Sequence, residues 1–239
     1  MFIEKDLGQK LIALVEKRGY QSDLRLNLLF LQQVGLIDNA GAVKPGTRIL
    51  EVGCGLGAMA AELTRRGSNV TALDLNLDEL KKGHQRYPEV NFVNADAHTL
   101  PFPNQSFDWI ISFDAMEHLV NFPQYLAEAR RVLVPNGLTA FEIPNKPVSR
   151  LWEWAKGNSF KLQQNYHPSV QTYWGLQKLF REAGFAKPQF SRMPFMDSKA
   201  LDEIQITALA PITRLLQLIP WHWWPQPLYP MFHAVTQRM

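Results

Sequence analysis

The chain has 239 residues, of which 46% are hydrophobic and 20% are charged, and its formal net charge is +3. This composition is typical of a folded globular protein and excludes a disordered chain. The one cysteine, Cys54, excludes an internal disulfide and is typical of a reducing compartment. No apolar run reaches the length of a membrane span, and charges interrupt the apolar positions of residues 1–20, which predicts an amphipathic helix there and a cytoplasmic protein.

The charge is unevenly distributed along the chain. Residues 1–119 hold 12 basic and 15 acidic residues, whereas residues 120–239 hold 13 and 7, together with six of the seven tryptophans. A basic, tryptophan-rich second half indicates contact with an anionic or interfacial partner, and a solvated basic face explains the same counts equally well. Because the basic residues are spread out, we expect no nucleic-acid partner.

Helical and strand patterns alternate along most of the chain. Two helices are expected first, over residues 3–18 and 22–34 of an N-terminal helical segment, 1–44. The later helices are expected over residues 58–67, 76–88, 122–137 and 172–185. The strands are expected over residues 47–52, 69–75, 90–96, 107–113, 138–144, 186–192 and 231–239. Apolar strands separated by helices predict an α/β fold, a single domain over 1–239 with a doubly wound, mostly parallel seven-stranded sheet.

Two stretches, 146–168 and 194–230, interrupt this alternation. Insertions at the carboxyl ends of strands carry substrate covers in α/β proteins, so we interpret both as parts of a helical cap. Within the second stretch, residues 208–224 form an amphipathic pattern that ends in Trp221, Trp223 and Trp224. This segment is expected to cover the acceptor pocket, with peripheral contact to a membrane as the alternative.

A glycine-rich turn follows the first expected strand. Gly53, Gly55 and Gly57 stand where that strand passes into a helix, and glycine permits tight turns and close approach of the backbone to a ligand. With Asp74 about twenty residues on, they also satisfy the dinucleotide fingerprint, which by itself would indicate a nicotinamide-dependent oxidoreductase. Cys54, between the glycines, is expected to be a small buried filler because nothing basic adjoins it in sequence.

Four ordered elements surround the glycines. The turn reads Glu51-x-Gly-x-Gly-x-Gly, and Asp74 follows the second strand. Asp96 and Ala97 follow the third strand, and "FDWIISFDAMEHL" precedes "RVLVPNG". In these elements and their spacing the sequence resembles the class I S-adenosylmethionine-dependent methyltransferases, in particular the methyltransferase type 11 and ubiquinone-biosynthesis O-methyltransferase group. The resemblance covers residues 47–143 closely and the rest more loosely. It implies a Rossmann-like methyltransferase fold and S-adenosylmethionine as the cofactor.

The resemblance also implies roles for individual residues. Asp74 would accept both ribose hydroxyls, Asp96 the adenine amino group, and Ala97 would donate its N–H to the adenine ring. Glu51 would lie near the amino-acid portion of the cofactor. The other implied cofactor-binding residues are Gly53, Gly55, Gly57, Leu75 and Phe113. Ordinary turn or helix-cap roles are the alternative for Asp74 and Asp96.

The candidate catalytic residues follow the fourth strand. Asp114, Glu117 and His118 resemble the Glu-x-x-Glu-His set of ubiquinone-biosynthesis O-methyltransferases and small-RNA 3′-end methyltransferases, which bind a divalent metal. Here the first acid is an aspartate, one methylene shorter, and we assign no metal. His118 as a base or acceptor-orienting group, a metal site, and a structural helix start all remain open. His167 is expected over the same pocket, with an exposed loop histidine as the alternative.

These residues predict an enzyme that transfers a methyl group from S-adenosylmethionine to a small or lipophilic acceptor at a hydroxyl oxygen. An acceptor hydroxyl must lose its proton, which is the reason for seeking a base beside the cofactor. Methylation of a sugar or of an amine nitrogen is the alternative within this class. A tryptophan-lined cap favours a large apolar or aromatic acceptor.

Overall fold

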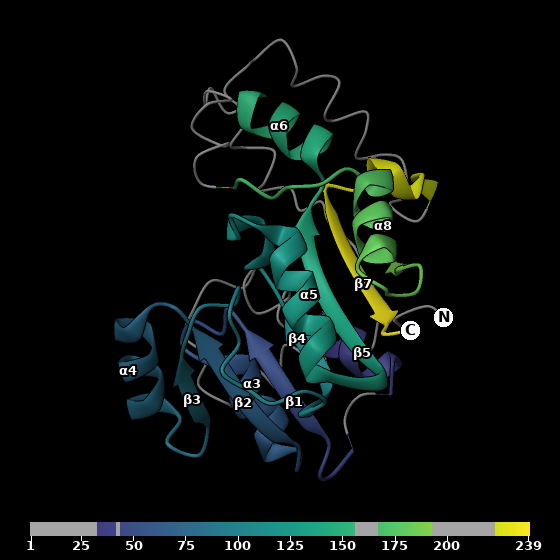
Figure 1. The fold of residues 1–239 in the computed structure, drawn as a ribbon. Helices are drawn as coiled ribbons and strands as arrows, with labels where there is room; N and C mark the ends of the chain where they lie inside the picture. Colours follow the sequence, from purple (N-terminus) through teal and green to yellow (C-terminus); the bar gives the residue numbers. More distant parts are fainter. Residues whose placement is uncertain (1–32, 42–43, 156–166, 193–222) are drawn as a thin grey trace.

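The structure is a computed structural model that describes residues 33–41, 44–155, 167–192 and 223–239. Strands and helices alternate through these residues around one twisted sheet (Figure 1). The strands are β1 (Arg48–Val52), β2 (Asn69–Asp74), β3 (Asn91–Asn94), β4 (Phe107–Ser112), β5 (Leu133–Pro144), β6 (Gln189–Ser191) and β7 (Met231–Gln237). The helices are α3 (Ala58–Arg65), α4 (Leu77–Arg86), η1 (Met116–His118), α5 (Phe122–Val132), α6 (Lys146–Ala155), α8 (Tyr173–Glu182) and η4 (Gln226–Leu228).

The sheet has seven strands in the order β3-β2-β1-β4-β5-β7-β6. All pairs from β3 to β5 are parallel, and β7 runs antiparallel to both of its neighbours. The predicted doubly wound, mostly parallel sheet is therefore confirmed. Strand order reverses beside β1, which lies between β2 and β4, and such a reversal is where open α/β sheets bind ligands at the carboxyl ends of their strands.

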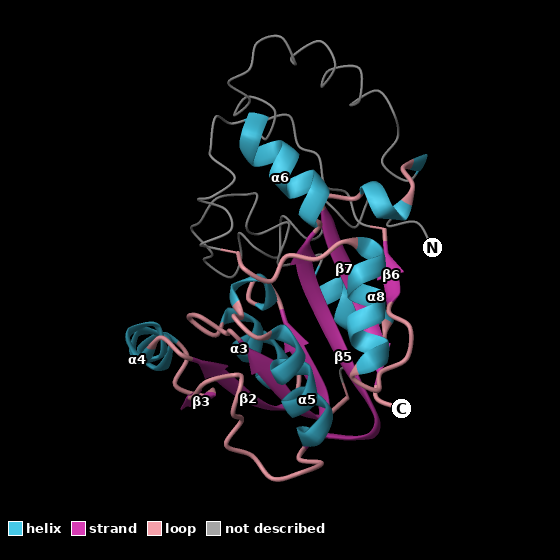
Figure 2. Cartoon of the chain, turned by 45° about the horizontal axis from the view of Figure 1, so that its top comes forward, coloured by secondary structure: helices cyan, strands magenta, loops and turns pink. Residues whose placement is uncertain are grey.

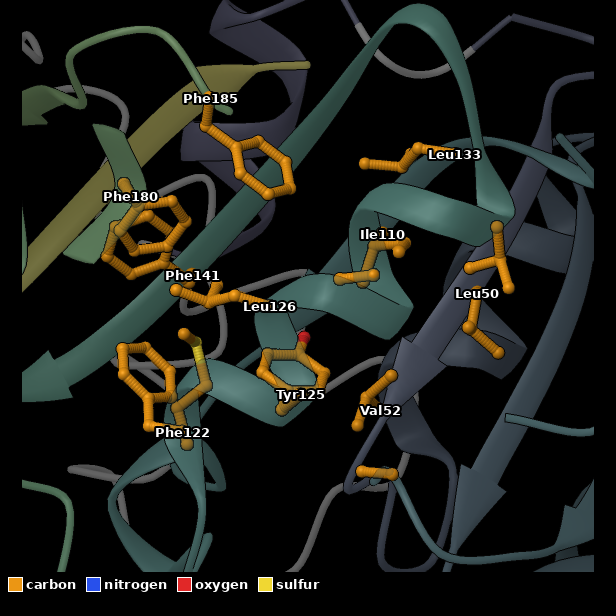
Figure 3. Packing of buried hydrophobic residues seen from close by; sticks show 14 of the residues in the cluster. Leu50, Val52, Ile110, Phe122, Tyr125, Leu126, Leu133, Phe141, Phe180 and Phe185 are labelled. Atoms are coloured by element: carbon orange, nitrogen blue, oxygen red, sulfur yellow. The ribbon is translucent and has the colours of Figure 1, made fainter. Parts of the chain in front are cut away.

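Helices cover both faces of the sheet, as the continuous apolar strands require. The face covered by α5 and α8 buries Leu50, Ile110 and Phe141, and the ring of Phe141 stacks on Phe180 at 4.7 Å between centroids (Figures 2 and 3). The opposite face packs against α3, α4 and the helical residues 33–39. Alternation of the strand side chains between these two clusters fixes which residues can reach each side.

Two predicted boundaries are wrong. The helix predicted over 122–137 ends at Val132, and β5 begins at once at Leu133. Asn136 has a φ of 62°, and the register with β4 shifts near Phe107, so the Asn-Gly pair forms an irregularity within the strand instead of ending the helix. The second N-terminal helix, predicted to end at 34, is helical as far as residue 39.

The predicted insertions are described in part. Residues 146–155 of the first insertion form α6, and residues 223–230 of the second contain η4. The predicted helix over 3–18 and residues 208–222 of the tryptophan-rich segment lie outside the described residues. None of the described helices is long and apolar enough to cross a membrane.

Candidate active site

The glycine turn lies directly beside the loop that follows β4. The backbone N–H groups of Gly53 and Cys54 donate to Leu73 O on β2 at 2.8 and 3.1 Å, which bends the chain away from β1. A Cβ on Gly53 would overlap the side chain of Ala115, and its φ of 75° is one that glycine favours. The loop of residues 113–118 is thus held against the turn, and Ser112 Oγ donates to Val52 O at 3.0 Å beneath it.

The three glycines have different reasons to be glycine. A Cβ on Gly57 would overlap the ring of Phe92, so Gly53 and Gly57 are both required by packing within the protein. A Cβ on Gly55 would meet nothing within 4 Å. Gly53 and Gly57 thus have a packing reason to be glycine, and the expected approach of a ligand to all three glycines stays a prediction. Gly55 is the position where open space lies against the backbone.

Asp74 and Glu51 flank this turn. Asp74 ends β2, and its carboxylate accepts from the backbone N–H of Gly55 and of Asn76, each at 2.8 Å. Glu51 is 6% exposed, and its Oε2 has no hydrogen-bond partner among the described residues. Burial raises the pKa of Glu51 to about 8, with a smaller rise from Asp74, against a hydrogen bond from Ala60 N–H that lowers it. Glu51 is therefore largely protonated at pH 7.

Asp96 and Ala97 follow β3 as predicted. Asp96 Oδ1 accepts from the backbone N–H of His98 at 2.8 Å and lies 2.7 Å from His98 Nδ1, and these contacts lower the pKa of Asp96. Asp96 thus has the turn role that was its alternative, and a carboxylate has a second oxygen with which to accept from a ligand. Ala97 is buried in the core, Leu75 is 71% exposed after β2, and Phe113 packs partly at the end of β4.

Glu117, His118 and His167 come together at the carboxyl edge of the sheet. Their ligating atoms lie within 4.8 Å of one another, and the two imidazole rings are 4.8 Å apart between centroids. Ser169 N donates to Glu117 O at 3.0 Å and the Ser169 hydroxyl donates to Leu119 O, so the loop that carries His167 is tied to η1. The structure thus brings His167 beside His118, and a place for His167 over an acceptor pocket stays a prediction.

Asp114 and Glu117 differ sharply in environment. Glu117 is 1% exposed, and burial raises its pKa to about 9, with further rises from the neighbouring carboxyls of Asp114 and Glu142. Asp114 is exposed, shares a hydrogen bond with Glu117, and has a φ of 53°, a conformation that aspartate tolerates better than most residues. Glu117 is therefore a neutral hydrogen-bond donor at pH 7, beside an exposed carboxylate.

A second buried polar group lies on the neighbouring strands and was missed from the sequence. Glu142 on β5 is fully buried, its Oε2 accepts from Gln33 Nε2 at 3.0 Å, and His233 Nε2 on β7 lies 2.9 Å from the same oxygen. Both residues interrupt apolar runs, "TAFEIP" and "MFHAV", which is the pattern that would have indicated them. The charge of Glu142 contributes to the raised pKa of Glu117.

The site can hold a cofactor and can also hold a divalent ion. Glu117, His118 and His167 offer one oxygen and two nitrogen ligands, a set that suits a borderline metal such as zinc or manganese. Open space at Gly55 and the unpartnered Oε2 of Glu51 fit a ligand that carries an ammonium group. A hollow of about 430 Å³ lies at the opposite edge of the sheet, lined by Arg48, Asn69 and Asn91 among others, and no predicted site residue lines it.

Comparisons with known proteins agree with this arrangement. Residues 50–141 match the family model described as a methyltransferase domain. The chain is 42% identical over 113 residues to a phthiotriol/phenolphthiotriol dimycocerosates methyltransferase of Mycobacterium leprae, covering 46% of this chain and 42% of that one. It is 42% identical over 104 residues to a demethylmenaquinone methyltransferase of Renibacterium salmoninarum, covering 43% of each. The chain thus spans less than half the length of these two curated relatives.

The fold has counterparts among solved structures. A putative sarcosine dimethylglycine methyltransferase from Galdieria sulphuraria superposes with a TM-score of 0.63 at 15% identity, over 91% of this chain and 89% of that one. At this identity the likeness shows the fold alone, and the sequence match shows the family of the central domain. The glycine pattern therefore belongs to a methyltransferase and not to an oxidoreductase. We conclude that residues 50–141 are a methyltransferase domain, in a chain that has the fold of the class I, S-adenosylmethionine-dependent methyltransferases.

Proposed function

We propose that this protein transfers a methyl group from S-adenosylmethionine to a hydroxyl oxygen of a lipophilic small molecule. The observation that carries the proposal is the meeting of three ligating side chains within 4.8 Å: Glu117 and His118, from the segment packed against the glycine turn, and His167. The two relatives described above act, by their names, on phthiotriol dimycocerosates and on demethylmenaquinone, which supports a lipophilic acceptor.

The residues around the glycine turn would hold the cofactor. Asp74 would accept the ribose hydroxyls at the end of β2, and Asp96 with Ala97 would bind the adenine beyond β3. Glu51 would face the ammonium group, where its unpartnered Oε2 supports the assignment. Leu75 and Phe113 would contact the adenosine from the ends of β2 and β4. The bound cofactor supplies a methyl group already activated on a sulfonium, so the protein mainly aligns the acceptor and excludes water.

The histidine pair would remove the acceptor's proton. Neutral imidazole accepts a proton near pH 7, so His118 would take the proton that the acceptor hydroxyl loses when it receives the methyl group supplied by the cofactor. Glu117, which burial keeps protonated, would donate a hydrogen bond within the cluster and fix the orientation of the imidazoles. The exposed carboxylate of Asp114 would stabilise the imidazolium that results.

Asp74→Ala is expected to weaken S-adenosylmethionine binding by about 2–3 kcal/mol, since hydrogen bonds to a charged group contribute in this range. Calorimetry measures the change, and NAD is expected to give no heat. Because Asp74 also accepts from Gly55 N and Asn76 N, a matched control is needed for the turn itself. Asp74→Asn keeps one acceptor oxygen, so its affinity for S-adenosylmethionine should lie between those of the wild type and Asp74→Ala. Wild-type affinity in Asp74→Ala would contradict the assignment.

The acceptor atom is tested with matched acceptors. Purified protein and methyl-labelled S-adenosylmethionine are offered a long-chain phenol, the corresponding amine and a simple sugar. Labelled ether is the expected product, and transfer to the amine or sugar alone would contradict the oxygen assignment and favour the alternative class. Dialysis against a chelator tests whether a metal bound by Glu117, His118 and His167 is needed. Activity is expected to survive. A loss of activity that one divalent ion restores would favour a metal-assisted mechanism over the base mechanism.

Residues 146–168 and 194–230 would form the cap over the acceptor. Peripheral membrane contact through residues 208–224 stays a prediction. Only Trp223 and Trp224 of this segment lie among the described residues.

A further inference from the structure

Five large apolar side chains are exposed on three elements near the candidate site. Leu151 and Trp154 on α6 are 60% and 44% exposed, Trp174 at the start of α8 is 68% exposed, and Trp223 and Leu228 before and within η4 are 72% and 49% exposed. We call these five residues the apolar end face. Three of the five are tryptophans, which are large and usually buried.

A shared junction holds the three elements together at the carboxyl end of β5. Asn145, fully buried, donates from its side chain to Pro227 O at 2.8 Å and to Tyr229 O at 2.7 Å, which fixes η4. Lys146 N at the start of α6 donates to Gln171 O at 2.9 Å, one residue before the cap of α8. Both ribbon views place α6, η4 and the first turn of α8 at this same end of the molecule (Figures 1 and 2).

The charged residues on these elements lie on α6 and have a small excess of positive charge. α6 carries Lys146 and Arg150 against one acid, Glu153, and residues 173–177 and 223–230 carry no charged residue. Tryptophan prefers the boundary between water and lipid, and basic side chains beside it favour anionic headgroups. Exposed apolar residues alone would fit a protein partner equally well. Their combination with Lys146 and Arg150 favours a lipid surface with anionic headgroups.

We propose that the apolar end face docks the protein on an anionic membrane surface, with the carboxyl edge of the sheet toward the lipid. Glu117, His118 and His167 lie at the same edge, and Ser169, two residues from His167, belongs to the loop that leads into Gln171. A lipophilic acceptor can then reach the histidines from the bilayer. The benefit to catalysis rests on the proposed function, but the docking itself does not depend on catalysis.

Vesicle flotation tests the docking. The wild-type protein is expected to float with vesicles of phosphatidylcholine and phosphatidylglycerol, less with phosphatidylcholine alone, and less at high salt. Trp154→Gln/Trp174→Gln/Trp223→Gln is expected to reduce partitioning about tenfold or more, and Lys146→Gln/Arg150→Gln is expected to reduce it on anionic vesicles only. Met239→Gln is the matched control, since Met239 is 65% exposed beyond the far end of β7 and should float as the wild type does.

Two further measurements keep the outcome decisive. Quenching of wild-type tryptophan fluorescence by brominated lipid needs no variant, so it stands if the triple variant fails to fold. Sedimentation without lipid tests the alternative that a second copy of the chain covers the apolar end face. Failure of the wild type to float, or equal flotation of a folded triple variant, overturns the proposal, as does a dimer that the triple variant abolishes. Activity on a water-soluble phenol is measured separately, so loss of docking is distinguished from a wrong reaction.

Discussion

Replacing His118 with alanine is expected to lower turnover about 10²–10⁴-fold while the affinity for S-adenosylmethionine stays unchanged. The imidazole lies with Glu117 and His167 at the carboxyl edge, and His118 is not among the proposed cofactor residues, so its loss would remove a proton acceptor and no cofactor contact. Steady-state kinetics at saturating cofactor measure the effect, and calorimetry measures the affinity. The residual rate should rise with pH, because hydroxide or a prior ionisation of the acceptor replaces the base.

Controls separate a base from a structural histidine. His167→Ala is expected to lower turnover less than His118→Ala, and the double variant should be no worse than His118→Ala, because residues that act as a unit are not additive. His84→Ala on α4 is the matched control, since His84 is exposed and lies outside the cluster. Wild-type turnover in His118→Ala would leave the histidine as part of a structural helix start.

The order of elements could be predicted because each strand is a short apolar run and each helix has a visible stop. Asn76 caps α4 by accepting from Asp78 N and Glu79 N, and Gly184 follows α8 with a φ of 79°, so both boundaries follow local rules. The start of β5 could not be predicted this way. Its first residues pair with β4 through a shifted register, which depends on a neighbour far away in sequence.

In the candidate site, too, local motifs could be predicted from the sequence and contacts between distant residues could not. Asp74, Asp96 and the glycines occupy fixed places in a local motif, so their positions follow from the sequence. Why Gly53 and Gly57 are glycine depends on Ala115, in the loop after β4, and on Phe92 of β3, and these contacts could not be anticipated. His167 lies near His118 because loops after the carboxyl ends of strands meet at one edge. Glu142 and His233 were missed because each is a single polar residue in an apolar strand, and only their pairing in the sheet explains them.

Glu51→Gln is expected to make the protein more stable than the wild type at pH 8, by about 3–5 kcal/mol at most, and nearly as stable at pH 4. The pKa of Glu51 is raised by burial to about 8, above its ordinary value of 4.5. Between these values the folded chain binds the proton and the unfolded chain releases it, so the free energy of unfolding falls as the pH rises from about 4.5 to 8 and is level above. Glutamine does not titrate, so Glu51→Gln lacks this decrease in the free energy of unfolding.

Denaturant titrations from pH 4 to pH 9 measure the effect as the difference between variant and wild type. Glu117, whose pKa is raised to about 9, contributes a fall in the same direction to both proteins, so the difference isolates Glu51. Glu182→Gln is the matched surface control, because the Glu182 side chain is 58% exposed, and its curve should run parallel to the wild type. A Glu51→Gln curve that also runs parallel would mean that Glu51 is ionised in the folded protein.

The same residue links cofactor binding to proton release. The unpartnered Oε2 of Glu51 is proposed to face the ammonium of S-adenosylmethionine, and a positive charge at that point favours the carboxylate. Binding at pH 7 should therefore release up to about one proton from Glu51, seen in calorimetry as a binding heat that varies with the ionisation enthalpy of the buffer. Glu51→Gln should bind with a heat independent of the buffer. A wild-type heat independent of the buffer would separate Glu51 from the ammonium and leave its burial a matter of stability alone.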